Sequence, residues 1–352
     1  MTARQVTLAE VARHAGVSLA TASRVLNGST RQVSDELRER VGGAARELGY
    51  LPNASAQALA RNSSVLVGLV VHDIADPYFS GIAAGVTRVA EEAGLVVVLG
   101  TTGRDPDREV QLVNTLRAHR ARALVIAGSR STDRHAVARL AEELAAFTGQ
   151  GGRVACVSQA RLGVDTVVPA NRAGARALAR RLAALGHRRF AVLAGPPDLL
   201  VARDRLTGFR AGLADAGVEL PDAHVVHGGF TRDGGHGAAL RLLAAGTGAT
   251  CVFAVNDVMA MGAVAALREH GVRVPEDVSL AGFDDIPTLR DLAPGLSTVR
   301  LPLEEMGERA ARLVLDEVVG EPRAVRVAGE VVLRASTASP SGAGLRRPAT
   351  TL

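Results

Sequence analysis

Six side chains between residues 19 and 27 have the types and spacing that a DNA-binding surface needs. Serine and threonine hydroxyls donate hydrogen bonds to phosphates, and arginine binds guanine O6 and N7 in a bidentate manner. Leucine or alanine can contact the methyl group of thymine. The residues that supply these groups are Leu19, Ala20, Thr21, Ser23, Arg24 and Asn27. The set predicts DNA contact, and an ordinary pair of packed helices is the alternative interpretation.

Two short helices would hold these side chains on one face. Thr7 and Glu10 have the spacing of a capping box, which starts the first helix. A three-residue turn follows, in which Gly16 can adopt the left-handed conformation. Ser18 then caps the second helix, whose buried face is formed by Ala22, Val25 and Leu26. This arrangement predicts a helix-turn-helix and adds Thr7 and Ser18 to the DNA-binding candidates.

A third helix, capped by Ser34, is predicted over residues 35–48. The three helices would make an all-α headpiece of residues 1–50, with a core so small that it is only marginally stable. Residues 51–64 follow as a hinge helix and linker, in which Asn53 can cap an alanine-rich helix. Because a helix this short is unstable alone in water, a plain linker and a helix that folds only when docked both remain open.

From residue 65 onward, buried strands alternate with helices. Continuous β-branched runs between helices are typical of parallel strands that are buried on both faces. Strands are expected at 65–71, 95–100, 123–128 and 153–158, and in a second series at 166–168, 190–195, 224–228, 249–255 and 278–283. Helices are expected near 79–93, 106–120, 133–147, 171–185, 203–216, 231–245 and 257–270. The pattern predicts an α/β core of two doubly wound parallel-sheet lobes, with a ligand cleft at the carboxyl ends of the strands.

This core is expected to span residues 65–337. The first lobe would comprise about 65–161 with 290–320, and the second lobe 162–289 with 321–337. Residues 338–352 are small and polar, and we expect them to form a flexible tail.

Composition limits the classes of function. The chain has 352 residues, 47% hydrophobic and 22% charged, which is typical of a globular protein with two or three domains. All its basic residues are arginine, and the net charge of +5 is too small to prove a nucleic-acid partner. Cys156 and Cys251 lie far apart and outside any CxxC, so neither a zinc site nor a disulfide framework is indicated. The absence of a signal peptide and of a membrane-spanning apolar run predicts a cytoplasmic protein with no membrane partner.

No motif indicates catalysis or a bound cofactor. A GxGxxG between strand and helix is missing, and the nearest sequence, at 246–248, precedes a strand. GxSxG, HExxH and Walker A motifs are also missing. His224, His227 and His236 straddle a strand and a glycine-rich loop, which favours solvated histidines over a metal site. We therefore expect no enzymatic activity, no cofactor and no metal.

Several segments, in this order, resemble the LacI/GalR family of transcriptional regulators over nearly the whole chain. They are VTLAEVARHAGVSLATASRVLN, GYLPNASAQALA, VGLVVHDIADPYF, ALGHRRFAVLAGP, FAVNDVMAMG, LAGFDDIP and STVRLPLEEMG. The resemblance implies a helix-turn-helix headpiece, a hinge helix and a core similar to type I periplasmic sugar-binding proteins. It also implies binding to pseudo-palindromic operator DNA. Tetrameric members add a C-terminal leucine heptad, which residues 340–352 lack, so we expect a homodimer.

The resemblance further implies roles for single residues. Leu59 matches the hinge leucine that wedges into the minor groove at the operator centre, and the same segment places Asn53 among the DNA-binding residues. The residues implied to line the effector cleft are Asp76, Tyr78, Phe79, Ser158, Arg205, Phe230, Asn256 and Asp284. Aromatic faces beside charged bidentate groups suit a sugar. The expected function is thus that of a repressor controlled by a sugar or sugar derivative.

Two departures from the family pattern affect the effector. Ser158-Gln159 stands where relatives often carry Asp-Arg, and Ala170 stands where many have an aspartate before the asparagine that corresponds to Asn171. Weaker hydroxyl recognition at Ser158-Gln159 disfavours a common pentose or hexose. A nucleoside or purine effector is the alternative, and a sugar-binding protein without DNA function is a more distant one.

Overall fold

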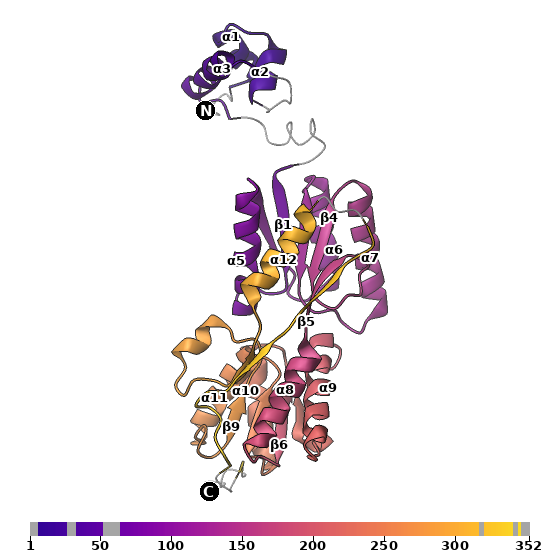
Figure 1. Ribbon diagram of the computed structural model, residues 1–352, viewed down its shortest axis with the longest axis vertical. Coiled ribbons are helices and arrows are strands. Elements are labelled where there is room, and N and C mark those ends of the chain that lie inside the picture. Colours follow the sequence, from indigo (N-terminus) through magenta and orange to yellow (C-terminus); the bar gives the residue numbers. More distant parts are fainter. Residues whose placement is uncertain (1–5, 27–32, 52–63, 317–319, 341–343, 346–352) are drawn as a thin grey trace. The chain divides into compact units, whose positions relative to one another are not determined.

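The computed structural model describes residues 6–26, 33–51, 64–316, 320–340 and 344–345. It divides into two compact units (Figure 1). The smaller unit comprises residues 1–65 with 119–121, and the larger comprises 66–118 with 122–352. Each unit is described by itself below. Asn27, Asn53 and Leu59 lie outside the described residues, and so does most of the expected hinge helix.

Three helices lie in the described part of the smaller unit, and its local structure confirms the predicted helix-turn-helix. Helix α1 spans Leu8–His14, α2 spans Leu19–Leu26 and α3 spans Asp35–Glu47. Thr7 and Glu10 form the capping box, and Gly16 turns the chain with a φ of +61°. The hydroxyl of Ser18 accepts from the amide of Thr21 at 3.1 Å. The core of this unit consists mainly of small side chains, namely Val11, Ala12, Ala15, Ala22, Val41, Ala44 and Ala45.

The first lobe of the larger unit is a six-stranded parallel sheet in the order β11-β5-β4-β3-β1-β2. Its strands are β1 Leu66–Val71, β2 Val96–Thr101, β3 Ala123–Ala127, β4 Arg153–Val157, β5 Asp165–Pro169 and β11 Ala324–Val327. Its helices are α5 Pro77–Glu92, α6 Pro106–Ala118, α7 Arg134–Gly149 and α12 Leu303–Leu315. Helix α12 packs closely on α5, because a Cβ at Gly85 would lie only 2.0 Å from the carbonyl oxygen of Glu304.

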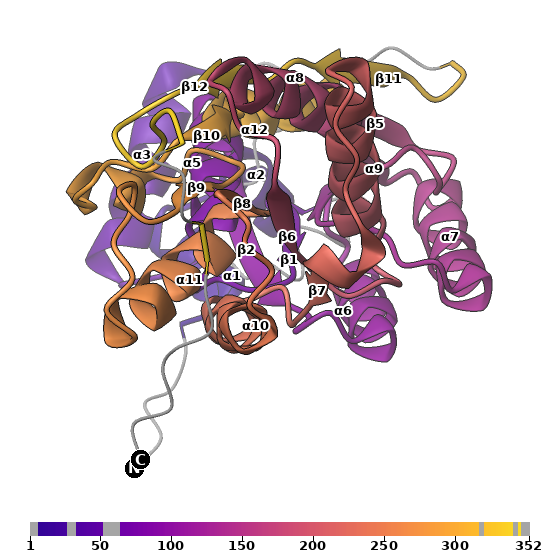
Figure 2. The same cartoon turned by 90° about the horizontal axis from the view of Figure 1, so that it is seen from below.

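The second lobe has a four-stranded parallel sheet in the order β7-β6-β8-β9. Its strands are β6 Phe190–Ala194, β7 Val225–His227, β8 Cys251–Ala254 and β9 Ser279–Ala281. Its helices are α8 Asn171–Ala184, α9 Leu200–Asp215, α10 Arg232–Ala245 and α11 Asp257–Glu269, with α8 and α9 side by side (Figure 2). Two 3-10 turns lie at Asp222–His224 and Pro287–Asp291, and β10 Thr298–Arg300 pairs antiparallel with β12 Glu330–Val332.

The expected border between the lobes is wrong in two places. Strand β5 pairs with β4, and β11 pairs with β5, so both strands belong to the first sheet. Strand β10, which was expected in the first lobe, instead bridges to the second lobe through Ala281–Ser297. The physical reason is that hydrophobic periodicity predicts a strand but says nothing about which distant strand will pair with it.

The expected flexible tail is also partly ordered. The carbonyl oxygen of Ala338 accepts from the hydroxyl of Ser279 at 3.3 Å, and it lies 2.9 Å from Nε2 of His187. Leu345 is buried and exchanges backbone hydrogen bonds with Gly248 and Ala249. Residues 338–340 and 344–345 therefore pack on the second lobe, because backbone pairing compensates for their polar composition.

Candidate functional site

Helix α2 presents most of its predicted DNA-binding side chains to solvent. Ser18, Leu19, Ala20 and Arg24 are exposed, and Leu19 is 53% exposed although it is a large apolar residue. Thr21 and Ser23 are half-buried. The apolar residues Val25 and Leu26 are half-buried as well. Thr7 is exposed at the start of α1, where its side chain caps the helix. One exposed face therefore combines hydroxyl, guanidinium and apolar groups, as a reader of phosphates and base edges requires.

A cleft lies between the two lobes of the larger unit, at the carboxyl ends of β1, β3, β4 and β5. Seven of the eight predicted effector residues line it, namely Asp76, Tyr78, Phe79, Ser158, Arg205, Phe230 and Asp284. The eighth, Asn256, does not. It is buried, and its side-chain oxygen accepts from the amide of Met259 at 3.0 Å, so that it caps α11. Asn256 therefore does not line this cavity, because its position after β8 serves the helix that follows.

The charged centre of the cleft is the ion pair between Arg205 and Asp284. The two guanidinium Nη atoms of Arg205 donate to the carboxylate of Asp284 at 2.6 and 3.2 Å. Arg205 also donates to Oδ1 of Asn171 at 2.9 Å and to the carbonyl of Val255 at 2.8 Å, and its guanidinium lies 3.9 Å from the ring centroid of Phe283. Both partners are almost fully buried, at 2% and 4% exposure. Arg205 is therefore fixed by the protein and holds the Asp284 carboxylate in place.

The backbone and the ionisation of Asp284 are both unusual. Its φ of 121° lies in a region that residues other than glycine rarely adopt, and such strain is typical of functional sites. Burial raises the pKa of Asp284 to about 7, and the charge of Arg205 opposes this shift. The group can therefore accept a hydrogen bond when ionised, and it depends on Arg205 to remain ionised at neutral pH.

Aromatic rings lie on both sides of the cleft. Tyr78 and Phe79 form an edge-to-face pair at 5.1 Å, but Phe79 is only 4% exposed and mainly supports Tyr78 from the core. Burial raises the pKa of Tyr78, so its hydroxyl remains a neutral donor. Across the cleft, the guanidinium of Arg104 lies 5.6 Å from the ring centroid of Phe230 and donates to the carbonyl of the same residue at 3.3 Å.

The remaining two predicted residues are engaged in local hydrogen bonds. Asp76 caps α5 by accepting from the amide of Tyr78 at 3.0 Å, and burial raises the pKa of its carboxyl group. Ser158 donates from its hydroxyl to the carbonyl of Gly128 at 2.6 Å. Ser158 therefore has no second proton to donate to an effector.

Five polar residues that the prediction did not include as effector-binding also line the cleft. They are His72, Arg104, Ser129, Gln159 and Asn171. The first four lie one to three residues after the ends of β1, β2, β3 and β4, respectively. The rule that ligands bind at the carboxyl ends of parallel strands would have identified them.

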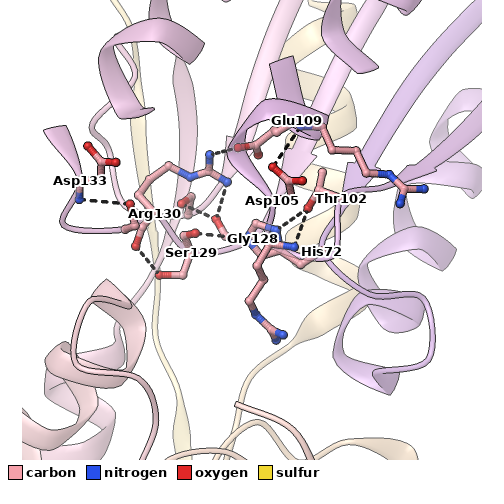
Figure 3. A network of polar contacts seen from close by, with 12 residues as sticks. His72, Thr102, Asp105, Glu109, Gly128, Ser129, Arg130 and Asp133 are labelled. Atoms are coloured by element: carbon pink, nitrogen blue, oxygen red, sulfur yellow. Dashed lines mark hydrogen bonds and ion pairs between the residues drawn. The ribbon is translucent and has the colours of Figure 1, made fainter. Parts of the chain in front are cut away.

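His72 is held in one neutral form. Its Nε2 lies 3.1 Å from the carbonyl oxygen of Ser129, which can only accept, so this nitrogen carries the proton. Its Nδ1 then accepts from the hydroxyl of Thr102 at 3.0 Å. Burial, followed by the charge of Arg130, lowers the pKa of His72 to about 4. Figure 3 shows this histidine beside the buried pair of Arg130 and Glu109.

Hydrogen bonds from backbone amides join the two lobes along one side of the cleft. The amide of Thr132 donates to the carbonyl of Asp198 at 2.8 Å, and the amide of Leu200 donates to the carbonyl of Arg130 at 3.0 Å. The amide of Val201 donates to the hydroxyl of Ser129 at 2.9 Å. The cavity at the cleft centre has a volume of only about 40 Å³, room for a few water molecules. A larger occupant therefore requires side chains or lobes to move apart.

Comparisons with known proteins give the family. Residues 7–53 match the family model for bacterial regulatory proteins of the lacI family, and residues 179–337 match the model of a periplasmic binding protein-like domain. The transcriptional regulator CelR of Thermobifida fusca is 36% identical over 90% of this chain and 93% of its own length. GalR of Escherichia coli K12 is also 36% identical, over 88% of each chain. The chain belongs to the LacI family.

Solved structures of LacI-family proteins share its architecture. A lac repressor dimer bound to operator and the anti-inducer ONPF has a TM-score of 0.79 at 28% identity, covering 95% of this chain and 100% of that one. A complex of CelR with cellobiose has a TM-score of 0.69 at 33% identity, again over 95% and 100%. The lacI-family protein described here is thus a DNA-binding transcriptional regulator with a type I periplasmic-binding-protein-like core.

Four further observations concern other classes of function. The curated relatives CelR and GalR are transcriptional regulators rather than enzymes. Within the described ranges, no group of three or more His, Cys, Asp or Glu side chains could hold a metal ion. In the same part of the chain, no helix has both the length and the apolar character needed to cross a membrane. Cys156 and Cys251 are both buried free thiols.

Proposed function

We propose that this LacI-family regulator represses transcription from a pseudo-palindromic operator, which it binds as a homodimer, and that a sugar or sugar derivative in the cleft controls this binding. The observation that carries the proposal is the buried pair of Arg205 and Asp284, which faces the same cavity as Tyr78 and Phe230. A fixed carboxylate between aromatic faces suits the hydroxyls and the C–H faces of a sugar ring.

The polar groups around this pair extend the match to a hydroxylated ring. Gln159 accepts from the backbone amide of Arg130 at 3.0 Å through its side-chain oxygen, which leaves its NH₂ group to donate. Asp284 supplies acceptors, and the Tyr78 hydroxyl supplies a donor. One of the similar structures is a complex of the relative CelR with cellobiose. These groups would bind the effector more tightly in one arrangement of the lobes than in the other, which is the requirement for control of DNA binding.

On the DNA side, we assign readout to the exposed face of α2. Arg24 would bind a guanine in each half-site, while Thr7, Ser18, Thr21 and Ser23 would position the helix on phosphates. Leu19, Ala20 and Asn27 would contact base edges or thymine methyl groups. Leu59, on a hinge helix capped by Asn53, would act as the wedge at the operator centre. Circular-permutation gel shifts test the wedge, because an unchanged DNA bend with Leu59→Ala would contradict it.

The homodimer is supported by the exposed apolar surface of the first lobe. Strand β2 is an edge strand, and its Val96, Val98 and Leu99 are 55%, 40% and 40% exposed. Ile74 nearby is 50% exposed. An apolar edge of this kind suits a self-complementary two-fold interface. Sedimentation at micromolar concentration should show a dimer that Val98→Glu converts to a monomer, and a stable tetramer would contradict the proposal.

The test of the proposed function combines calorimetry with operator binding. A panel of sugars, sugar phosphates and nucleosides is titrated into the full chain and into Asp284→Asn. Binding to an operator selected from random DNA is then measured with each compound that binds. We expect a sugar to change operator affinity for the wild type, and Asp284→Asn to lose the response while it keeps its operator affinity in the absence of effector. A full response in Asp284→Asn would show that the cleft is not the effector site.

A nucleoside is the second candidate, because Tyr78 and Phe230 could stack on a base as well as on a sugar ring. The PurR repressor of Klebsiella pneumoniae is 31% identical over 94% of this chain and 97% of its own length. The same calorimetric panel separates the two candidates. Binding of nucleosides or purines, but of no sugar, would replace the sugar by a base as the effector.

A further inference from the structure

Three segments of the described chain cross between the two lobes of the larger unit. The first crossing leads from β5 in the first sheet into α8 of the second lobe. The second leads from β10, which bridges to the second sheet, into α12 of the first lobe. The third leads from β11 in the first sheet into β12, which pairs with β10. A change in the arrangement of the lobes must bend or shift these segments, because they are covalent links.

A strained dipeptide of the second lobe lies against the second crossing. Asp284 and Asp285 have φ angles of 121° and 57°, both in the positive region that favours glycine. The amide of Asp284 donates to the carbonyl of Val299 at 2.8 Å, and the carbonyl of Asp284 accepts from the amide of Leu301 at 3.2 Å. The backbone of Asp284 is therefore bonded to the residues on both sides of Arg300, while its side chain faces the cleft.

The carboxylate of Asp285 does not line the cleft and is held by two arginines instead. Nε of Arg300 donates to Oδ2 of Asp285 at 2.7 Å. Nη1 of Arg334 lies 2.7 Å from Oδ1, and Nη2 donates to Oδ2 at 3.0 Å. Burial opposes ionisation of this carboxyl group, but the hydrogen bonds from Arg334 and Arg300 outweigh it and lower the pKa. We call these three residues the clamp.

The clamp joins two of the three crossings. Arg300 is the last residue of β10, and Arg334 lies two residues after the end of β12. Nη1 of Arg334 also donates to the carbonyl of Leu296 at 2.7 Å, which ties the end of the third crossing to the start of the second. The side chain of Asp285 is only 10% exposed, so water screens these charges weakly.

The first crossing reaches the same dipeptide through Arg205. Asn171 is the first residue of α8, two residues after the end of β5, and its Oδ1 accepts from Nε of Arg205 at 2.9 Å. The Nη atoms of Arg205 in turn hold the carboxylate of Asp284 at 2.6 and 3.2 Å. Side-chain bonds therefore connect the dipeptide of Asp284 and Asp285 to each of the three crossings.

We propose that Asp285, held by Arg300 and Arg334, is the positioning residue that couples occupancy of the cleft to the arrangement of the lobes. The two carboxylates have separate tasks, because Asp284 contacts the effector and Asp285 holds the crossings. A shift of Asp284 passes to Asp285 through one peptide bond and from there to both arginines. The inference rests on the proposed function in one respect, namely that the effector binds in the cleft, and it holds for a sugar and for a nucleoside alike.

A clamp that only stabilises the fold predicts a different result from a clamp that couples. Loss of a stabilising contact lowers the free energy of unfolding but leaves the effect of the effector on operator affinity unchanged. Loss of a coupling contact abolishes this effect, even where the effector still binds. Coupling is also reciprocal, so the ratio of operator affinities with and without effector must equal the ratio of effector affinities with and without operator.

The experiment measures both ratios for the full chain and for Asp285→Asn. Asparagine tolerates the left-handed φ of 57° and has nearly the same shape, so the turn is kept while the charge is lost. Asp215→Asn is the matched control, because Asp215 accepts from Nε and Nη2 of Arg176 at 2.6 and 2.7 Å, within the second lobe and between α8 and α9. The probes are cellobiose, glucose, galactose and adenosine, each of which is first titrated by calorimetry.

Asp285→Asn should bind a probe that binds the wild type with an affinity within about threefold, yet the probe should change its operator affinity by less than about twofold. The wild type and Asp215→Asn should show a larger change, of about 5–150-fold, as is typical of coupled sites. Arg300→Met releases one of the two arginines from a half-exposed position, so it should also lower the ratio. This variant tests the clamp if Asp285→Asn does not fold.

Three results would overturn the inference, and they are distinguishable. If Asp285→Asn folds and keeps the wild-type ratio, the clamp is only structural and the proposed function still holds. If Asp285→Asn loses probe binding together with the ratio, Asp285 serves effector binding rather than coupling. If none of the four probes binds the wild type, the proposed function fails and the coupling role fails with it.

Discussion

The headpiece and the core use arginine in opposite ways. Arg24 on α2 is exposed to solvent, whereas Arg205 in the cleft is 2% exposed and is fixed by Asp284, Asn171 and the carbonyl of Val255. An exposed arginine must lose rotamer freedom when it binds, and a fixed one has already lost it on folding. Recognition of DNA should therefore tolerate small changes in the supporting structure better than recognition of the effector does.

The two regions also differ in what stabilises them. The headpiece helices α1 and α2 have only seven and eight residues, and the core beneath them consists mainly of alanine. Helices this short are marginal in water, so their caps contribute a large share of their stability. The lobes have buried parallel strands and buried ion pairs instead. The most damaging single substitutions should therefore fall on ion pairs in the core and on caps in the headpiece.

The largest effect is expected from Arg205→Ala. This change leaves the buried carboxylate of Asp284 without its partner, which typically costs about 3–5 kcal/mol. Urea unfolding of the core should show a loss of this size, and Arg24→Ala should leave core stability unchanged. The double variant Arg205→Met with Asp284→Asn should recover part of the loss, because it removes both charges. A loss below about 1 kcal/mol for Arg205→Ala would show that the pair is not a buried unit.

Local features of this fold could be predicted from sequence, because neighbouring residues determine them. The capping box of Thr7 and Glu10, the turn at Gly16 and the cap at Ser18 are all present in the structure. The alternation of strands and helices through the core is also confirmed, since long apolar runs can only be buried strands or helices there. Seven of the eight residues assigned to the cleft by resemblance line it.

Features that depend on distant pairing could not be predicted. Nothing near residues 165–169 indicates that this strand pairs with β4 rather than starting the second sheet. The resemblance implies that Asn256 contacts the effector. An asparagine after a strand can either cap a helix or face a ligand, and in the structure its side chain caps α11 through the amide of Met259. The pairing of Glu109 with Arg130 joins the start of α6 to the loop after β3, and the sequence contains no pattern for it.

A smaller but pH-dependent effect is expected from His72. Its pKa in the folded chain is about 4, below the ordinary value of 6.5. Between these two values the unfolded chain binds a proton at this position and the folded chain does not, so stability falls as the pH decreases from 6.5 to 4. The contribution is at most about 1.4 kcal/mol per pH unit.

The difference between wild type and His72→Gln isolates this contribution. Asp257 acts in the opposite sense, because burial raises its pKa to about 6 and the folded chain then holds a proton that the unfolded chain releases. Urea unfolding at several pH values should show wild type losing stability relative to His72→Gln on acidification. Parallel curves of stability against pH for His72→Gln and wild type would show that His72 becomes protonated in the folded chain without unfolding the core.

Arg24→Ala tests the headpiece side of the comparison. The expected cost is about 1–3 kcal/mol of operator affinity per half-site, together with a relaxed preference at one base pair. Binding to every single-base variant of a selected operator measures both quantities. Arg40→Ala on α3 is the matched control, because it removes an exposed arginine of the same unit outside α2. An unchanged base preference in Arg24→Ala would mean that Arg24 contacts only phosphate.

The smallest effect is expected from Thr7→Ala, which removes the cap of α1. The Thr7 backbone amide donates to Glu10 at 2.8 Å, and the Thr7 hydroxyl accepts from the Glu10 amide at 3.4 Å, so the side chain satisfies one of the free amides at the start of a seven-residue helix. The loss should be about 1 kcal/mol and confined to the headpiece. Hydrogen exchange of the α1 and core amides in the full chain, without DNA, measures both units in one experiment. Thr7→Ser keeps the hydroxyl and should retain most of the protection. If Thr7→Ser loses as much protection as Thr7→Ala, the methyl group rather than the cap stabilises α1. The headpiece would then not depend on its helix caps in the way that the core depends on its ion pairs.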